Sequence, residues 1–188
     1  MKKTILLVLL TLGTFSYAQE QEVSKKWLFG FGSNLLNNNA LHADKYFSSK
    51  DINVIPTVSA FTVQRKFDNK FSVEGQFFLN ELEKENLHNG MMIDRNVTYA
   101  SINVNGLYTF DSHLVDVKWF DASVIAGLGA MWTDGVPNQT FNTGLALDFW
   151  LSPLVGLRLE TQGRFAFEKE QLGNNHIIHA ASIILPIQ

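Results

Sequence analysis

The chain has 188 residues, the length of one ordinary domain. It contains no cysteine, which excludes a disulfide framework, a cysteine zinc site, a thiol nucleophile and a lipid-modified cysteine. With 46% hydrophobic and 18% charged residues it is too apolar for a disordered protein, and its mean hydropathy of +0.01 is too low for a bundle of membrane helices. The formal net charge of −3, from 15 basic and 18 acidic residues, gives no basic surface of the kind that binds nucleic acid.

Residues 1–18, MKKTILLVLLTLGTFSYA, have the three parts of a secretory signal peptide. Lys2 and Lys3 form a positive region, residues 5–12 form an apolar core, and small residues stand where a signal peptidase cleaves. The apolar core is far shorter than the roughly 20 residues that a membrane helix needs. We therefore predict cleavage before Gln19, export across the inner membrane and a mature domain of residues 19–188.

The rest of the chain alternates between apolar and polar residues, which is the period of a β-strand with two different faces. Segment 155–167 is the clearest case, because Leu157 and Leu159 alternate with Arg158 and Glu160. Most of the segments have the roughly 9–11 residues, or slightly more, that a tilted strand needs to cross a bilayer. Eight such segments span residues 26–35, 54–66, 71–80, 97–110, 119–132, 140–151, 155–167 and 176–187.

The connections between these segments alternate in length. Long connections are expected at 36–53, 81–96, 133–139 and 168–175. Short connections are expected at 66–70 and 152–153, with the longer stretch 111–118 as the exception. An even number of strands with long loops at one end and mostly short turns at the other is typical of an outer-membrane barrel. The predicted fold class is all-β: an eight-stranded antiparallel up-and-down transmembrane β-barrel.

The direction of the apolar face separates this barrel from a secreted soluble β-domain, which is the main alternative. A soluble domain would enclose its apolar face, whereas a membrane barrel turns it towards lipid. The signal peptide and the unequal loops favour the membrane barrel. Aromatic residues near segment ends would then form two interfacial girdles. One contains Trp27, Phe71, Tyr108, Phe110, Trp119 and Phe120, and the other contains Phe77, Tyr99, Trp132 and Phe141.

Several charged residues fall on the polar face of the segments, which would line a narrow lumen. Isolated buried charges are costly, so they must find partners there. We predict that they form a salt-bridged plug instead of an open channel. The predicted lumen charge network consists of Glu74, Asp121, Asp148, Arg158, Glu160 and Arg164.

Three C-terminal stretches resemble the last four strands of the OmpA-type transmembrane barrel: GLGAMWTDG (127–135), FNTGLALDFWLSPLVGLRLETQGRFAFE (141–168) and HIIHAASIILPI (176–187). The similarity covers residues 120–187 well and the N-terminal half only in its alternation. It implies an outer-membrane protein of a Gram-negative bacterium with a structural, envelope-integrity or surface-interaction role. Its implied partners are outer-membrane lipid, lipopolysaccharide and the barrel assembly machinery, with the surface partner left open. We expect no peptidoglycan-binding domain after Gln188. The last predicted strand, 176–187, ends without a terminal aromatic residue.

Few residues suggest chemistry. His176 and His179 are three apart, so on a strand they point to opposite faces and cannot form one metal site. His179 and Ser182 are also three apart and therefore point to opposite faces of a strand, which argues against a catalytic pair. The GxG fragments at 30–32 and 127–129 lack the strand–turn–helix context of nucleotide binding, and we expect their lumen glycines to make room for larger neighbours. No catalytic residue, cofactor or metal is predicted. Two alternatives stay open beside the structural role: a narrow pore for small polar solutes and a lipid-modifying barrel enzyme.

Overall fold

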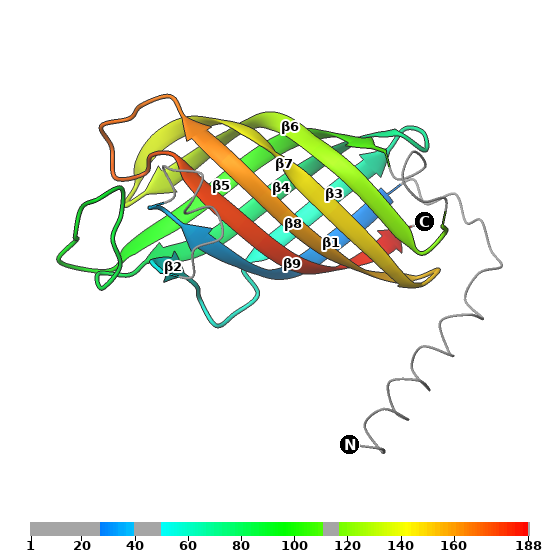
Figure 1. Cartoon of the computed structure of the whole chain (residues 1–188), viewed down its shortest axis with the longest axis horizontal. Helices are drawn as coiled ribbons and strands as arrows, with labels where there is room; N and C mark the ends of the chain where they lie inside the picture. The colour runs from blue at the N-terminus through cyan, green and yellow to red at the C-terminus, as the bar shows by residue number, and fades with distance from the viewer. Residues whose placement is uncertain (1–26, 40–49, 111–116, 188) are drawn as a thin grey trace, which may run out of the picture.

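The computed structural model describes residues 27–39, 50–110 and 117–187, so the predicted signal peptide lies outside the described residues. Eight long strands and one short strand make up the described secondary structure (Figure 1). No helix in the described ranges is long and apolar enough to cross a membrane. The strands are β1 (Trp27–Asn37), β2 (Ile52–Asn53), β3 (Ala60–Lys66), β4 (Phe71–Leu82), β5 (Val97–Thr109), β6 (Phe120–Thr133), β7 (Val136–Ser152), β8 (Val155–Ala166) and β9 (His176–Ile187).

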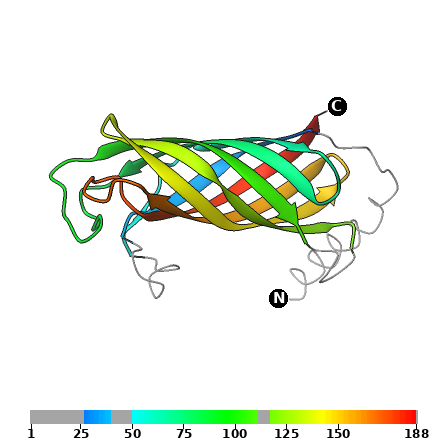
Figure 2. The ribbon, with the colours of Figure 1, turned by 90° about the horizontal axis from the view of Figure 1, so that it is seen from above.

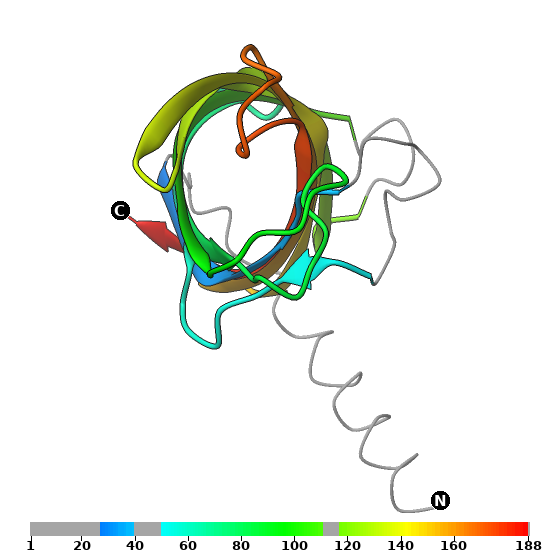
Figure 3. The same cartoon turned by 90° about the vertical axis from the view of Figure 1, so that its left-hand side faces the viewer.

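The eight long strands close into a barrel, as the view along its axis shows (Figure 3). Each long strand pairs antiparallel with the next one in the chain, and β1 also pairs with β9 along its whole length, from Trp27 opposite Ile187 to Asn37 opposite Ile177. The short β2 pairs with the C-terminal end of β1, at Leu36 and Asn37. This arrangement confirms the predicted eight-stranded antiparallel up-and-down β-barrel.

The strands run obliquely, and those of the near and far walls cross in projection (Figure 2). Following the cross-strand partners once around the barrel from Asn37 leads back to β1 at Trp27, ten residues away. With eight strands, such a stagger corresponds to a strand tilt of roughly 40°. The interior is then just wide enough for side chains to fill it.

The two ends of the barrel differ. The terminal end holds Trp27 and Ile187 together with the β3–β4, β5–β6 and β7–β8 connections. The loop end holds the β1–β3 connection, which contains β2, and the β4–β5, β6–β7 and β8–β9 connections. The long connections expected at 36–53, 81–96 and 168–175 all fall at this loop end.

One expected long loop is wrong. Residues 133–139 were assigned to a connection, but β6 and β7 continue as a paired hairpin to Thr133 and Val136, joined only by Asp134 and Gly135. Both turn residues have positive φ, 55° and 78°. This is the conformation of a two-residue type I′ turn, for which Asp-Gly is a preferred sequence. The local turn chemistry therefore outweighs the reduced alternation around Pro137.

The segment expected at 54–66 is interrupted. Only residues 60–66 form β3, and residues 54–59, which include Pro56, lie outside the strands, although Ser59 keeps backbone hydrogen bonds to Gly32 and Leu79, each 2.8 Å long. Side-chain amides add hydrogen bonds where the strand is interrupted. Asn34 Nδ2 donates to the carbonyl oxygens of Ser59 (3.0 Å) and Leu79 (2.9 Å), and Asn80 Nδ2 donates to Asn34 Oδ1 (2.8 Å). Backbone groups in a membrane wall must be satisfied inside the protein, which explains this amide cluster.

The side chains sort in the direction expected of a membrane barrel. On β7 and β8, Phe141, Leu145 and Phe165 are 44–49% exposed on the outside, whereas their neighbours Asn142 and Arg164 are fully buried inside. The same sorting runs around the wall. Exposed apolar residues of the strands include Val63, Val73, Phe77, Ile102, Val104, Val124, Leu128, Leu157, Leu159 and Ile183.

The aromatic girdle at the terminal end is dense. Phe71 packs on Tyr108, and Phe149 contacts both Trp119 and Phe120. Aromatic rings at this level suit a membrane interface. The expected girdle at the loop end needs one correction. Tyr99 does not face outwards, because its side chain is only 2% exposed and lies in the barrel interior.

Candidate functional site

The candidate site is the polar interior, and Arg158 of β8 is at its centre. Its Nε donates to Asp148 Oδ1 and its Nη2 to Asp148 Oδ2, both at 2.7 Å, in a two-pronged contact with the neighbouring strand β7. On the other side, Nη1 donates to Glu74 of β4 and Nη2 donates to Gln64 Oε1 of β3 at 2.6 Å. Arg158 is 2% exposed, and Asp148 and Glu74 are equally buried. One guanidinium thus joins two carboxylates from strands on different sides of the lumen.

Glu160 is buried two residues after Arg158 on the same inward face of β8, and side-chain amides donate hydrogen bonds to it. Gln76 Nε2 donates to Glu160 Oε1 at 2.8 Å and to Glu74 Oε1 at 2.7 Å, and Gln162 Nε2 also donates to Glu160. Within the described residues Glu160 has no ion pair. The amide of Gln76 therefore separates two carboxylates by giving a hydrogen bond to each.

Arg164 lies farther towards the loop end and differs from the expectation of a charge pair. Its Nη1 donates to Ser101 Oγ at 2.7 Å and to Tyr99 Oη at 3.1 Å, and its guanidinium lies 4.9 Å from the centre of the Phe78 ring. No carboxylate of the described residues is within ion-pair distance of it. Hydroxyl groups and an aromatic face hold this cation instead.

Asp121 forms a separate pair near the terminal end. It accepts from Lys66 Nζ at 3.3 Å and from Trp150 Nε1 at 2.9 Å, and its side chain is about a quarter exposed. Sequence reasoning placed Lys66 at the boundary between segment 54–66 and the connection 66–70 and did not include it among the lumen charges; it is the last residue of β3. The structure thus brings Glu74, Asp148 and Arg158 into direct contact, joins Glu160 through Gln76, and places Asp121 and Arg164 elsewhere.

Asparagines and glycines fill the lumen beside the charges. Asn142 Nδ2 donates to Asn103 Oδ1 at 3.0 Å and to Asn105 Oδ1 at 3.3 Å. A Cβ atom added at Gly127 or Gly129 would collide with Asn105 or Asn103. These glycines therefore make room for larger neighbours, as the sequence predicted.

An apolar layer closes the interior at the loop end, which the sequence analysis did not foresee. Leu172 of the β8–β9 connection and Ile93 of the β4–β5 connection pack against it. The sequence could have indicated this layer, because the inward positions near the strand ends at the loop end carry large apolar residues. The layer consists of Leu36, Ala60, Phe78, Leu82, Val97, Tyr99, Met131, Ala166, Ile178 and Ala180.

Hydrogen bonds join the connections above this layer to one another. Asn38 Nδ2 donates to the carbonyl oxygen of Leu172 at 2.9 Å. Asp51 accepts from Asn39 Nδ2 and from the backbone N–H of Leu87, each at 3.0 Å. The described parts of three connections are thus tied together around the mouth that Figure 3 shows.

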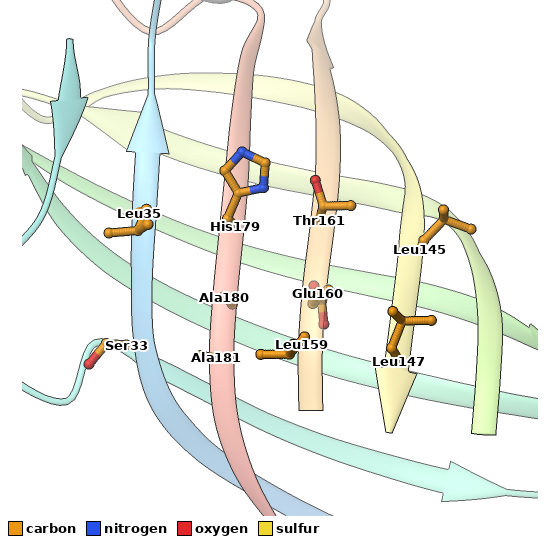
Figure 4. Close-up of a pocket in the computed structure, with 10 residues that line it drawn as sticks. All are labelled: Ser33, Leu35, Leu145, Leu147, Leu159, Glu160, Thr161, His179, Ala180 and Ala181. Atoms are coloured by element: carbon orange, nitrogen blue, oxygen red, sulfur yellow. The ribbon is translucent and has the colours of Figure 1, made fainter. Parts of the chain in front are cut away.

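His176 and His179 lie on opposite sides of the barrel wall. His176 is buried inside, where its Nε2 is 2.8 Å from Tyr99 Oη. His179 faces outwards and lines a hollow in the outer wall (Figure 4), whereas Ser182 is buried inside. Within the described ranges, no three His, Cys, Asp or Glu residues are grouped so that they could hold a metal ion.

Comparison with known proteins gives structural matches only. No family model matches the chain, and no curated protein matches its sequence. Neisserial surface protein A is similar in structure, with a TM-score of 0.54 at 10% identity over 86% of this chain and 96% of that one. The N-terminal β-barrel domain of Pseudomonas aeruginosa OprF has a TM-score of 0.53 at 10% identity, over 85% and 96%. The Yersinia pestis outer-membrane protein Ail in a nanodisc has a TM-score of 0.49 at 11% identity, over 85% and 97%. On the first two of these matches, the chain has the fold of the eight-stranded OmpA-type outer-membrane barrels.

Proposed function

We propose that this protein is an integral outer-membrane barrel of a Gram-negative bacterium with a structural or surface-interaction role and no enzymatic activity. The observation that carries the proposal is the sorting of side chains, with apolar residues outside and buried charges inside. Such a surface is unstable in water and stable in lipid, and the closed sheet leaves no open edge in hydrocarbon. The proposed partners are outer-membrane lipid, lipopolysaccharide and the barrel assembly machinery. The mature domain would reach them after residues 1–18 direct its export.

The loop end is proposed to face the cell exterior, because the longer loops of such barrels are extracellular. Single cysteines can test this cleanly, since the natural chain has none. Lys84 in the β4–β5 connection and Lys70 in the β3–β4 turn are exposed at opposite ends of the barrel. A membrane-impermeant maleimide should label Lys84→Cys on intact cells and should label Lys70→Cys only after the outer membrane is disrupted. The reverse pattern would show that the orientation is wrong.

The interior is proposed to be a plug. Arg158 and its two carboxylates close the middle, and the apolar layer closes the loop end. Planar-bilayer recordings of the purified barrel should therefore show no steady conductance of porin size. A narrow pore for small polar solutes is the second candidate, favoured by the polar middle of the lumen. A small conductance that shifts on replacing Arg158 or Glu160 with glutamine would support the pore.

A lipid-modifying enzyme is the least supported reading. His179 and Ser182 lie on opposite sides of the wall and cannot act on one substrate. Deleting the gene should leave the mass spectrum of lipid A unchanged. A missing acyl or headgroup modification in that spectrum would contradict the proposed non-enzymatic role.

A further inference from the structure

A hollow of about 540 Å³ opens on the outer wall of the barrel, where β1, β9, β8 and β7 lie side by side (Figure 4). Four of its ten lining residues are leucines, with Leu35, Leu145, Leu147 and Leu159 around Ala181. Exposed apolar side chains adjoin it, among them Leu157 and Ile183, so the hollow lies within the band that would face lipid. We call it the outer hollow.

The strand register explains why the wall is hollowed here. Outward residues of the four strands form two neighbouring rows, one from Leu35 through His179 and Thr161 to Leu145. The second row runs from Ser33 through Ala181 and Leu159 to Leu147. Two short side chains, those of Ser33 and Ala181, stand together in this second row beside two leucines. A larger residue at position 181 would project into the depression.

The position of the outer hollow identifies what fills it. Water is absent from the hydrocarbon core, and an unfilled hollow forfeits dispersion contacts for every atom that lines it. Its volume lies in the range of pockets that enclose one small molecule, about 300–1,000 Å³. A protein partner would need a matching protrusion and a much larger buried surface. A flexible acyl chain fits such a space and is the solvent already present.

The outer hollow also contains polar side chains. Thr161 and His179 are cross-strand partners, so their Cβ atoms stand roughly 5 Å apart on the outer face. Ser33 is exposed nearby, and its Oγ donates to the carbonyl oxygen of Thr57 at 3.3 Å. Polar groups at membrane depth are expensive and mark functional sites. A lipid that carries a hydrogen-bonding group on its chain would give His179 and Thr161 a further contact.

We propose that the outer hollow binds one acyl chain of a membrane lipid, and that His179 and Thr161 select a chain bearing a hydroxyl group. The inference rests on the barrel being embedded in a bilayer, as proposed above. It adds a lipid-binding site on the outer wall, away from both the lumen and the surface loops.

Native mass spectrometry of the barrel released from nanodiscs tests the proposal. The probes are two synthetic phosphatidylethanolamines that differ only by a hydroxyl group on one acyl chain. The natural chain should retain one lipid, with the hydroxylated lipid held about fivefold better, the effect of one net hydrogen bond. Ala181→Phe should fill the outer hollow and abolish retention. Ala126→Phe is the matched control, because Ala126 is exposed on the outer face of β6 and does not line the hollow, and it should retain the lipid.

His179→Leu separates the two parts of the proposal, because it should keep lipid retention and lose the preference for the hydroxylated chain. If Ala181→Phe fails to fold, Ala181→Leu replaces it as the filling variant. Equal retention by the filling and control variants would overturn the proposal, and so would a dimer that Ala181→Phe dissociates. A protein that fractionates without detergent as a soluble monomer would instead disprove the membrane location proposed above.

Discussion

At the scale of single residues, Arg158 shows how a charge is accommodated inside a narrow barrel. A guanidinium has donors fixed in a planar fork, which lets it meet Asp148 with two parallel hydrogen bonds and still reach Glu74 and Gln64. A lysine would supply the charge without this geometry. The contact therefore depends on the residue type as well as on its charge.

We expect Arg158→Met to be strongly destabilising, because Glu74 and Asp148 would stay buried without a cation. The expected loss in the free energy of unfolding is about 3–5 kcal/mol, measured by urea titration of the barrel folded in micelles. Arg95→Met is the control. Arg95 pairs with Asp134 on the surface with side chains 62% and 47% exposed, so its loss should cost less than about 1 kcal/mol.

Removing the carboxylates together with the cation separates charge from volume. A triple variant with Arg158→Met, Glu74→Gln and Asp148→Asn should recover much of the stability that Arg158→Met loses. If it recovers nothing, packing of the guanidinium and not its charge is what the interior needs.

Arg164 offers the opposite case. Its partners are the hydroxyls of Tyr99 and Ser101 and the ring of Phe78, and Tyr99 keeps its contact with His176 when Arg164 is gone. Arg164→Met removes a desolvated charge that has no carboxylate partner among the described residues. We therefore expect the free energy of unfolding to fall by at most about 1–2 kcal/mol in the same titration. A loss as large as that of Arg158→Met would point to an ion pair formed in the membrane.

At the scale of elements, the β6–β7 hairpin depends on its two-residue turn. Gly135 has φ of 78°, where an L side chain is strained, so Gly135→Ala should cost about 1–2 kcal/mol of unfolding free energy. Gly106→Ala is the matched control on the outer face of β5, because the nearest atom to its added Cβ is 3.7 Å away. It should change stability by less than about 0.5 kcal/mol. Equal effects would mean that the turn does not limit the hairpin.

The interrupted strand between β2 and β3 shows a second way to complete an element. Beside residues 54–59, the amide of Asn34 donates to the backbone carbonyls of Ser59 and Leu79, and Asn80 supports Asn34. Asparagine is suited to this because its side chain carries the same donor and acceptor as a peptide group. Side-chain amides therefore add hydrogen bonds to the wall where the strand is interrupted.

At the scale of the whole molecule, closure of the sheet predicts resistance to detergent. Every long strand has two partners, so unfolding in SDS must break the barrel as a unit. We expect an unheated sample to migrate differently from a boiled one on an SDS gel, with one sharp transition as the temperature of treatment rises. Identical mobility before and after boiling would argue against a closed barrel in detergent.

The period-2 alternation by itself determined the number of long strands, their approximate bounds and which side chains share a face. It could do so because alternation is local: a residue two positions along a strand has the same face whatever the partner strand is. This phase placed Glu74, Asp148, Arg158, Glu160 and Arg164 on one polar face, and the signal peptide and the unequal loops indicated that this face lines the lumen. The Asp-Gly turn was equally local, and its signal could have been read from the sequence.

Only the tertiary structure decided which lumen residues touch. Glu74 and Arg158 are 84 residues apart, and they meet because the tilt and stagger of eight strands place β4 opposite β8 at that level. The same geometry moves Asp121 to a pair with Lys66, leaves Arg164 among hydroxyls, and gathers apolar side chains into one layer at the loop end. Alternation assigns each side chain to a face, but contacts across a closed barrel depend on the stagger, which no single strand encodes.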